Sequence, residues 1–234
     1  MATAYLSRTA GTPTNSKKNT LSVWVKRSAI STGTFFGGGS DANNMTFINF
    51  DTNERIFIQS STSGSNTLVL TTNRKFRDPS AWMHIVVTTD TTLGTAGDRI
   101  KLYVNGVRET SFSTETQPSQ NYDMEWNKNS QTIEIGKYLF QSGYSQFDGS
   151  MTHFHFIDGT SYDASTFGET DSTSGIWKPK TAPSVTYGNN GFFLKMENSG
   201  AMGTDSSGNS NTFTVNGTLT QNVDTPSNNF ATLN

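Results

Sequence analysis

WMHIVVTTDTTLGTAGDRIKLYVNGVRETSF, residues 82–112, predicts two antiparallel strands, a polar loop between them and a tight hairpin after the second. The hairpin pivots on Asn105-Gly106, because a two-residue type I′ turn requires positive φ at both central positions, which Asn and Gly tolerate. Alternation ahead of this turn places Ile100, Leu102 and Val104 on one face of the second strand. The stretch therefore predicts an antiparallel sheet with Asn105-Gly106 at a hairpin tip.

The first strand of this stretch is apolar on both faces, which is typical of the middle of two stacked sheets. Short alternating or apolar runs predict further strands and no helix; these runs are 21–26, 34–36, 45–50, 55–59, 67–72, 132–137 and 147–157. We expect Gly37-Gly38-Gly39-Ser40 to form a flexible turn or bulge, and residues 113–130 to form a long polar loop.

The composition of the 234 residues fits one large β-sandwich with a tail. Hydrophobic content is only 32%, yet 16 Phe, 7 Tyr and 4 Trp supply bulky side chains for a core. Charged residues make up 15%, so the surface is built largely from Ser, Thr, Asn, Gln and Gly, as in extracellular or virion β proteins. We expect a sandwich domain over residues 1–200 and a C-terminal β extension over 201–234 with a hairpin at TFTVNGTLT (212–220).

Charge and cysteine content exclude several classes of function. A net charge of −2 gives no electrostatic reason to bind nucleic acid, which requires clustered Lys and Arg. The absence of cysteine excludes disulfides, thiolate metal sites and cysteine nucleophiles. No segment has the apolar length of a membrane span, and MATAYLSRTA lacks the order of a secretory signal, so we expect no membrane insertion and an exit route such as lysis.

The tryptophan-led strand, the polar loop and the LYVNG hairpin together resemble the laminin-G-like branch of the concanavalin A-like lectin/glucanase superfamily. The order of TIEIGKY (132–138), FDGSMTHFHFIDG (147–159), FGETDSTSGIWKPK (167–180), YGNNGFFL (187–194) and GTDSSGNSNTFT (203–214) is similar to that in structural proteins of marine bacteriophages, chiefly tail-fibre and virion-surface proteins. This second resemblance covers nearly the whole chain.

These resemblances imply an all-β fold, an antiparallel jelly-roll sandwich, on the surface of a virion. They imply a non-enzymatic tail-fibre or surface-fibre adhesin that binds host-surface carbohydrate and contacts other virion proteins. The alternative is a decoration or assembly protein of the virion with no sugar ligand. Phage fibres are commonly trimers, so we expect a homo-oligomer, and specifically a trimer, with the C-terminal extension at subunit or virion contacts.

A carboxylate pair and three histidines are the candidates for catalysis and transition-metal binding. Glu169-x-Asp171 resembles the carboxylate motif of glucanases, but Gly and Ser neighbours indicate a loop, so we predict turn chemistry and no enzyme. His84, His153 and His155 lack a further ligand at metal spacing, and we expect them to be satisfied sheet residues.

Calcium is the more serious inorganic candidate, because several laminin-G-like domains hold it at a loop rim with Asp carboxylates and backbone carbonyls. Asp90, Asp98 and Asp148 lie at predicted strand ends or loops, and 205–209 (DSSGN) resembles half of a calcium loop. No Asp-x-Asp-x-Asp run concentrates charge, so we predict no metal site and solvated turn aspartates.

Sugar binding requires an exposed aromatic platform beside amides and carboxylates. The loops 121–127 and 138–144 have this composition, and the candidate ligand-binding residues are Tyr122, Trp126, Tyr138, Phe140 and Tyr144. The alternative is that Trp126 and Phe140 fold back to plug the sandwich edge or pack on a neighbouring subunit. Trp24 and Trp82 are expected in the core.

Overall fold

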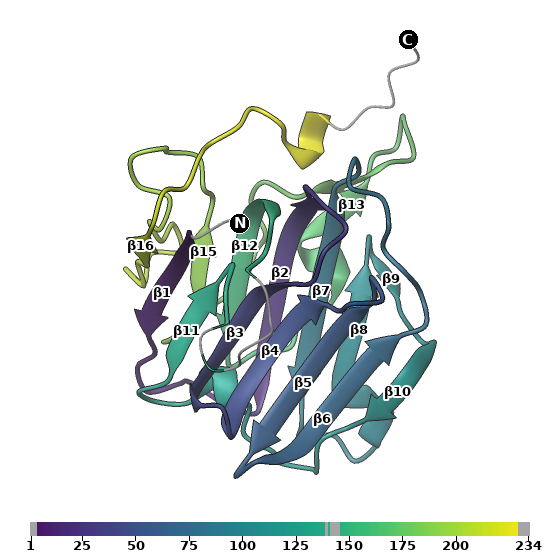
Figure 1. Ribbon diagram of the computed structural model, residues 1–234, viewed down its shortest axis with the longest axis vertical. Helices are drawn as coiled ribbons and strands as arrows, with labels where there is room; N and C mark the ends of the chain where they lie inside the picture. Colours follow the sequence, from purple (N-terminus) through teal and green to yellow (C-terminus); the bar gives the residue numbers. More distant parts are fainter. Residues whose placement is uncertain (1–3, 139, 141–145, 229–234) are drawn as a thin grey trace.

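The computed structural model describes residues 4–138, 140 and 146–228, which form two stacked antiparallel sheets (Figure 1). The front sheet in Figure 1 contains β1 Tyr5–Thr9, β3 Gly33–Asp41, β4 Asn44–Phe50, β5 Ile56–Thr62, β6 Ser65–Thr72, β10 Phe112–Thr116, β11 Thr132–Ile135 and β16 Thr214–Asn216. Its strand order is β10-β6-β5-β4-β3-β11-β1-β16.

The second sheet lies behind it and contains β2 Lys18–Arg27, β7 Met83–Asp90, β8 Ile100–Val104, β9 Val107–Arg108, β12 Gly149–Asp158 and β15 Phe192–Leu194. Its order is β15-β12-β2-β7-β8-β9. A small hairpin pairs β13 Gly168–Thr170 with β14 Trp177–Pro179. The helices of the described residues are four 3-10 turns: η1 Ala96–Asp98, η2 Glu125–Asn127, η3 Ala164–Thr166 and η4 Pro226–Asn228. The predicted two-sheet antiparallel sandwich is therefore confirmed.

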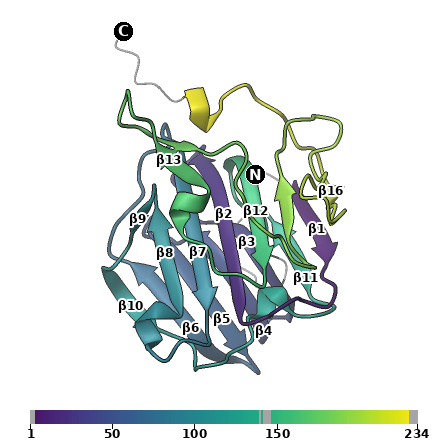
Figure 2. The ribbon, with the colours of Figure 1, turned by 180° about the vertical axis from the view of Figure 1, so that it is seen from behind.

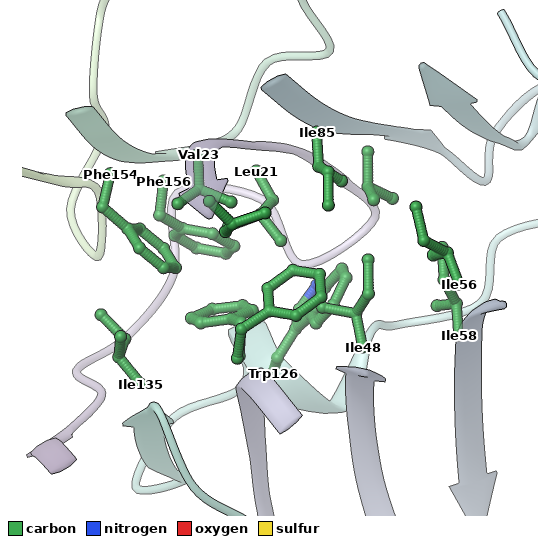
Figure 3. Packing of buried hydrophobic residues seen from close by; sticks show 14 of the residues in the cluster. Leu21, Val23, Ile48, Ile56, Ile58, Ile85, Trp126, Ile135, Phe154 and Phe156 are labelled. Carbon is green, nitrogen blue, oxygen red and sulfur yellow. The ribbon is translucent and has the colours of Figure 1, made fainter. Parts of the chain in front are cut away.

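The core lies between the sheets and is built from alternate residues of both (Figure 3). Leu21, Val23, Ile85, Phe154 and Phe156 project from the second sheet toward Ile48, Ile56, Ile58 and Ile135 of the first. All nine are at most 1% exposed. Burial of each such side chain contributes about 1.5–3 kcal/mol, so this layer is the main source of stability.

The hairpin prediction at Asn105-Gly106 is confirmed. Asn105 has φ 50° and Gly106 has φ 79°, as a type I′ turn requires, and Val104 pairs with Val107 across it. Ile100, Leu102 and Val104 point into the core with 2%, 1% and 1% exposure.

The expectation of a flexible turn at Gly37-Gly38-Gly39-Ser40 is wrong, because β3 runs through all four residues, but the alternative of a bulge is confirmed at its end, where the register with β4 shifts between Gly39 and Asp41. A Cβ on Gly37 would lie 2.7 Å from the Tyr138 ring, and one on Gly38 would lie 2.9 Å from the Trp126 Cα. The glycines therefore let neighbouring segments approach both faces of the strand. The expected loop over 113–130 also differs, since β10 extends to Thr116 and pairs with β6.

The expected hairpin over 212–220 is not formed. Instead, the single strand β16 pairs with β1, with Leu6 opposite Val215. Phe213, just ahead of β16, is 3% exposed and packs in the main core against Phe192. Strand β16 thus forms one edge of the first sheet.

Residues 159–187 form a third layer over the outer face of the second sheet (Figure 2). Trp177 of β14 stacks on His84 of β7, with ring centroids 6.0 Å apart, and His84 stacks in turn on Trp24 at 4.9 Å. Gly106 and Gly168 provide the space for the Trp177 indole, since a Cβ at either would lie 2.7 Å or less from it. The GIWKPK motif therefore serves to cover the sheet.

Two further motifs contribute to a buried hydrogen-bond network at the end of β12. The Asp158 carboxylate accepts hydrogen bonds from the backbone N–H of Thr14 (2.6 Å) and Asn190 (3.0 Å) and from Nδ2 of Asn127 (2.8 Å). Asp158 and Asn190 are each 1% exposed. A buried carboxylate requires such donors, which accounts structurally for the FIDG and YGNNGFFL motifs.

Candidate functional site

The expected platform of exposed aromatic side chains is wrong for Trp126 and Tyr138. Trp126 is 0% exposed and lies between the sheets in Figure 3, where its Nε1 donates to Asn19 Oδ1 at 3.2 Å. Tyr138 is 3% exposed and stacks on Phe47 on the outer face of the first sheet. The alternative, in which Trp126 plugs the sandwich, is confirmed.

The remaining candidates do not form a platform either. Tyr122 is half-buried, and its hydroxyl bonds to Ser60 (2.9 Å) and Thr62 (2.8 Å). Phe140 is half-buried against Tyr138. Tyr144 lies outside the described residues, and a ligand role for these loops stays a prediction.

The expectation that Glu169 lies in a loop is wrong, because it lies on β13, and Glu169 and Asp171 share one lysine. Lys178 Nζ lies 2.8 Å from Asp171 Oδ2 and 3.8 Å from Glu169 Oε1. Asp171 Oδ1 accepts the backbone N–H of Thr173 and Ser174, which is the turn chemistry expected from the sequence. The Lys178 hydrogen bond, helped by these donors, holds the pKa of Asp171 well below its usual range.

His84 and His155 are both buried, and each makes a hydrogen bond through a ring nitrogen. His84 Nδ1 accepts from Trp177 Nε1 at 3.0 Å, so its neutral ring carries the proton on Nε2, 2.8 Å from Ser22 Oγ. Burial lowers the pKa of His84 to about 3. His155 Nδ1 lies 2.8 Å from the Tyr187 hydroxyl, and burial lowers its pKa well below the usual range.

Among residues 4–138, 140 and 146–228, no group of three or more His, Asp or Glu is placed to hold a metal ion. Asp90 pairs with Lys18 at 3.0 Å, and Asp98 pairs with Arg108 at 3.4 Å. Asp205, in the segment that resembles half a calcium loop, accepts the N–H groups of Phe193 (2.9 Å) and Asn211 (2.7 Å).

The structure places a cavity of about 650 Å³ at the edge of the sandwich, which we call the edge cavity. β1 and the end of β11 contribute from the first sheet, β12 and β15 from the second, and residues 218–225 cover it. Residues 218–225 belong to the yellow segment that runs from β16 over the ends of β15 and β12 toward η4 in Figures 1 and 2. The chemically distinctive part of the lining is Tyr5, Trp82, Asp148, Ser150, Thr152, His153, Phe193, Lys195, Glu197, Asn222 and Asp224.

An irregularity in β12 shapes one wall of this cavity. The register between β12 and β2 shifts between Thr152 and His155, and His153 has φ 47°, a conformation rare for non-glycine residues. Such bulges re-aim side chains and gather beside functional sites. Burial lowers the pKa of His153, Glu197 opposes this effect, and Lys195 reinforces it.

The lining suits a polar ligand with apolar faces. Half-buried or buried rings of Tyr5, Trp82 and Phe193 lie near hydroxyl, amide and carboxylate groups. Lys195 and Glu197 lie 3.5 Å apart at the mouth with 43% and 70% of their side chains exposed, so both remain available to solvent and ligand. The lining was missed in the sequence because its residues come from segments far apart in the chain.

A sequence model of the concanavalin A-like lectin/glucanases superfamily matches residues 2–165, which is more than half of the chain. The chain belongs to this superfamily. This superfamily member finds no significant match among curated protein sequences.

Solved structures resemble this superfamily member in fold. A candidate carbohydrate binding protein from Bacteroides ovatus aligns with TM-score 0.55 and 15% identity, covering 96% of this chain and 59% of that one. The chain thus spans about three fifths of that protein. A heptameric SAP-like pentraxin from Limulus polyphemus aligns with TM-score 0.44 and 14% identity over 68% of this chain and 71% of that one. Domains LG4-5 of the mouse laminin alpha1 chain align with TM-score 0.46 and 8% identity over 82% and 44% of the two chains.

Proposed function

We propose that this superfamily member is a non-enzymatic carbohydrate-binding module of a bacteriophage virion surface, and that it holds its saccharide in the edge cavity. The observation that carries the proposal is the cavity itself, whose volume of about 650 Å³ lies in the range of small-ligand sites. Its mixture of aromatic rings, hydroxyls, amides and charges matches the two kinds of surface that a sugar presents.

Different lining groups would contact different parts of a bound sugar. The C–H faces of a pyranose pack on aromatic rings such as Phe193, while its hydroxyls require donors and acceptors such as Asn222, Thr152 and Glu197. A saccharide hydroxyl left without a partner in the cavity would cost about 1–3 kcal/mol, which gives such a site its selectivity.

The virion context rests on the order of motifs from TIEIGKY to GTDSSGNSNTFT, which is similar to that of marine phage surface proteins. Adsorption to a bacterial host then follows from glycan binding. A decoration protein without a sugar ligand is the competing function, and glycan binding separates the two.

The test is a glycan array probed with the full chain, followed by titration of the best glycan. Glu197→Ala removes an exposed cavity carboxylate and is expected to weaken binding about tenfold or more, the value of a hydrogen bond to a charged group. Glu169→Ala is the matched control, since Glu169 lies on β13 outside the cavity lining. No binding to any glycan, or equal losses in both variants, would contradict the proposal.

The non-enzymatic part has its own test. Asp171 is engaged by a turn and by Lys178, so the double change Glu169→Ala and Asp171→Ala is expected to leave glycan binding unchanged. The measurement is the release of reducing sugar from host polysaccharide by the unaltered chain, and we expect no release. Release that the double change abolishes would identify a hydrolase.

A further inference from the structure

Asp224 makes two side-chain contacts that hold the segment 218–225 over the edge cavity. Asp224 Oδ2 accepts from Lys26 Nζ at 2.6 Å, and Asp224 Oδ1 accepts from Trp82 Nε1 at 3.1 Å. The neighbouring fastenings are single hydrogen bonds from Asn222 to Ser150 (2.9 Å) and from Gln221 to the Glu197 carbonyl (2.6 Å). Val223, between them, is 95% exposed.

Lys26 and Trp82 form a donor pair shaped for a carboxylate. Each donor takes a different oxygen of the same planar group. Trp82 is 4% exposed, so its indole N–H requires an acceptor whenever Asp224 moves away. Trp82 lines the edge cavity, and Lys26 lies opposite Ser150, a lining residue, in the pairing of β2 with β12.

The contact that holds Asp224 is easily exchanged. The Lys26 and Asp224 side chains are 27% and 42% exposed, and exposed ion pairs contribute little net stability. A ligand carboxylate that replaced Asp224 would keep both hydrogen bonds and the charge balance. The exchange therefore loses only the contacts that dock residues 218–225 over the cavity.

We propose that the edge cavity takes an acidic saccharide, and that Lys26 and Trp82 bind its carboxylate at the position that Asp224 holds in the free protein. This inference rests on the proposed saccharide site and names its ligand class. Asp224 then acts as an internal competitor that the acidic sugar displaces.

Calorimetric titration of the full chain with trigalacturonic acid and with its methyl ester tests the inference, because the ester keeps the sugar backbone and removes the charge. We expect the acid to bind at least tenfold more tightly than the ester. Lys26→Gln should weaken binding of the acid about three- to tenfold and leave the ester unchanged. Asp224→Asn should tighten binding of the acid about threefold or more.

Asp148→Asn is the matched control, since it removes the same charge from the cavity lining and leaves in place Asp224, the partner of Lys26 and Trp82. A change below twofold is expected, and a gain equal to that of Asp224→Asn would show general electrostatics and overturn the inference. Equal affinity for acid and ester, equal loss of both in Lys26→Gln, or array binding confined to neutral glycans would overturn it and leave the saccharide site standing. Absence of binding to every glycan would overturn both proposals.

Discussion

At the scale of single residues, the role of an aromatic side chain is decided by what lies across from it. Trp126 comes from a polar loop, yet Gly38 leaves room for its backbone, and Phe36 and Phe156 pack on its ring. Its neighbour Glu125 is 1% exposed and is paired with Lys128 at 2.6 Å. The loop therefore closes one end of the core instead of presenting rings to solvent.

Replacement of Trp126 by Ala is expected to act on stability. Removal of a fully buried tryptophan leaves a cavity, so the free energy of unfolding should fall by about 3–5 kcal/mol. Urea denaturation measures the change, and Tyr122→Phe, which keeps the ring and removes one half-buried hydroxyl, is the mild control. A Trp126→Ala protein of unaltered stability would contradict the assignment of Trp126 to the core.

His84 and His155 make the fold sensitive to acid. Both are held neutral with depressed pKa values, at about 3 for His84, while in the unfolded chain they titrate near pH 6.5. The unfolded state therefore binds more protons below pH 6.5, so their stabilising contribution is complete above that pH and is lost as the pH falls below it, down to about 3 for His84. Each histidine adds a slope of up to about 1.4 kcal/mol per pH unit.

The measurement is urea unfolding at pH values from 7 to 4. His84→Gln keeps a polar side chain on the sheet and removes the titration, so its pH dependence should be shallower by about one proton than that of the unaltered chain. Parallel curves for the two proteins would show that His84 is not the group responsible.

At the scale of elements, the β8–β9 hairpin and the β13–β14 hairpin depend on one another. Asn105 Oδ1 accepts the backbone N–H of His84 at 2.8 Å, and Gly106 lies against the Trp177 indole. The same turn thus fixes the hairpin geometry and the docking of the third layer.

Gly106→Ala is expected to undock Trp177. The added methyl group would lie 2.7 Å from the indole, well inside van der Waals contact, and would also strain a residue with φ 79°. We therefore expect a loss of about 1–3 kcal/mol and a red shift of tryptophan emission. Gly94→Ala, where a Cβ meets nothing within 4 Å, is the control. Unshifted emission in Gly106→Ala would mean that Trp177 is held by other contacts.

The elements that could be predicted from sequence are those with a local signal. Alternation in β2, β4 and β8 and the Asn-Gly turn appear within a few residues, and the 45–50 and 55–59 hairpin forms as predicted between β4 and β5. Strand β16 and the path of β3 depend on partners that are remote in sequence, Leu6 and Trp126. The edge cavity follows the same rule, because Trp82, Ser150 and Asp224 come together only in the folded chain.

At the scale of the whole molecule, the chain adds two coverings to a two-sheet sandwich. Residues 159–187 close the outer face of the second sheet, and residues 218–225 cover the edge cavity (Figure 2). None of the described helices is long and apolar enough to cross a membrane. Each sheet has one edge strand with an exposed valine: Val215 on β16 in the first sheet and Val107 on β9 in the second.

These sheet edges offer a surface for the expected homotrimer. An edge strand with an apolar side chain is a natural site for association, and closed symmetric assembly is the usual outcome for soluble chains. β16 belongs to the C-terminal extension, so Val215→Lys should dissociate the assembly. Val107, which is 67% exposed, lies on β9 at an edge of the other sheet, so Val107→Lys should leave the assembly intact. Light scattering should give three times the chain mass of 25.6 kDa for the unaltered protein and for Val107→Lys, and the single chain mass for Val215→Lys. A monomeric unaltered protein would contradict the expected trimer. A trimer that persists in Val215→Lys would show that the subunits associate through a surface other than β16.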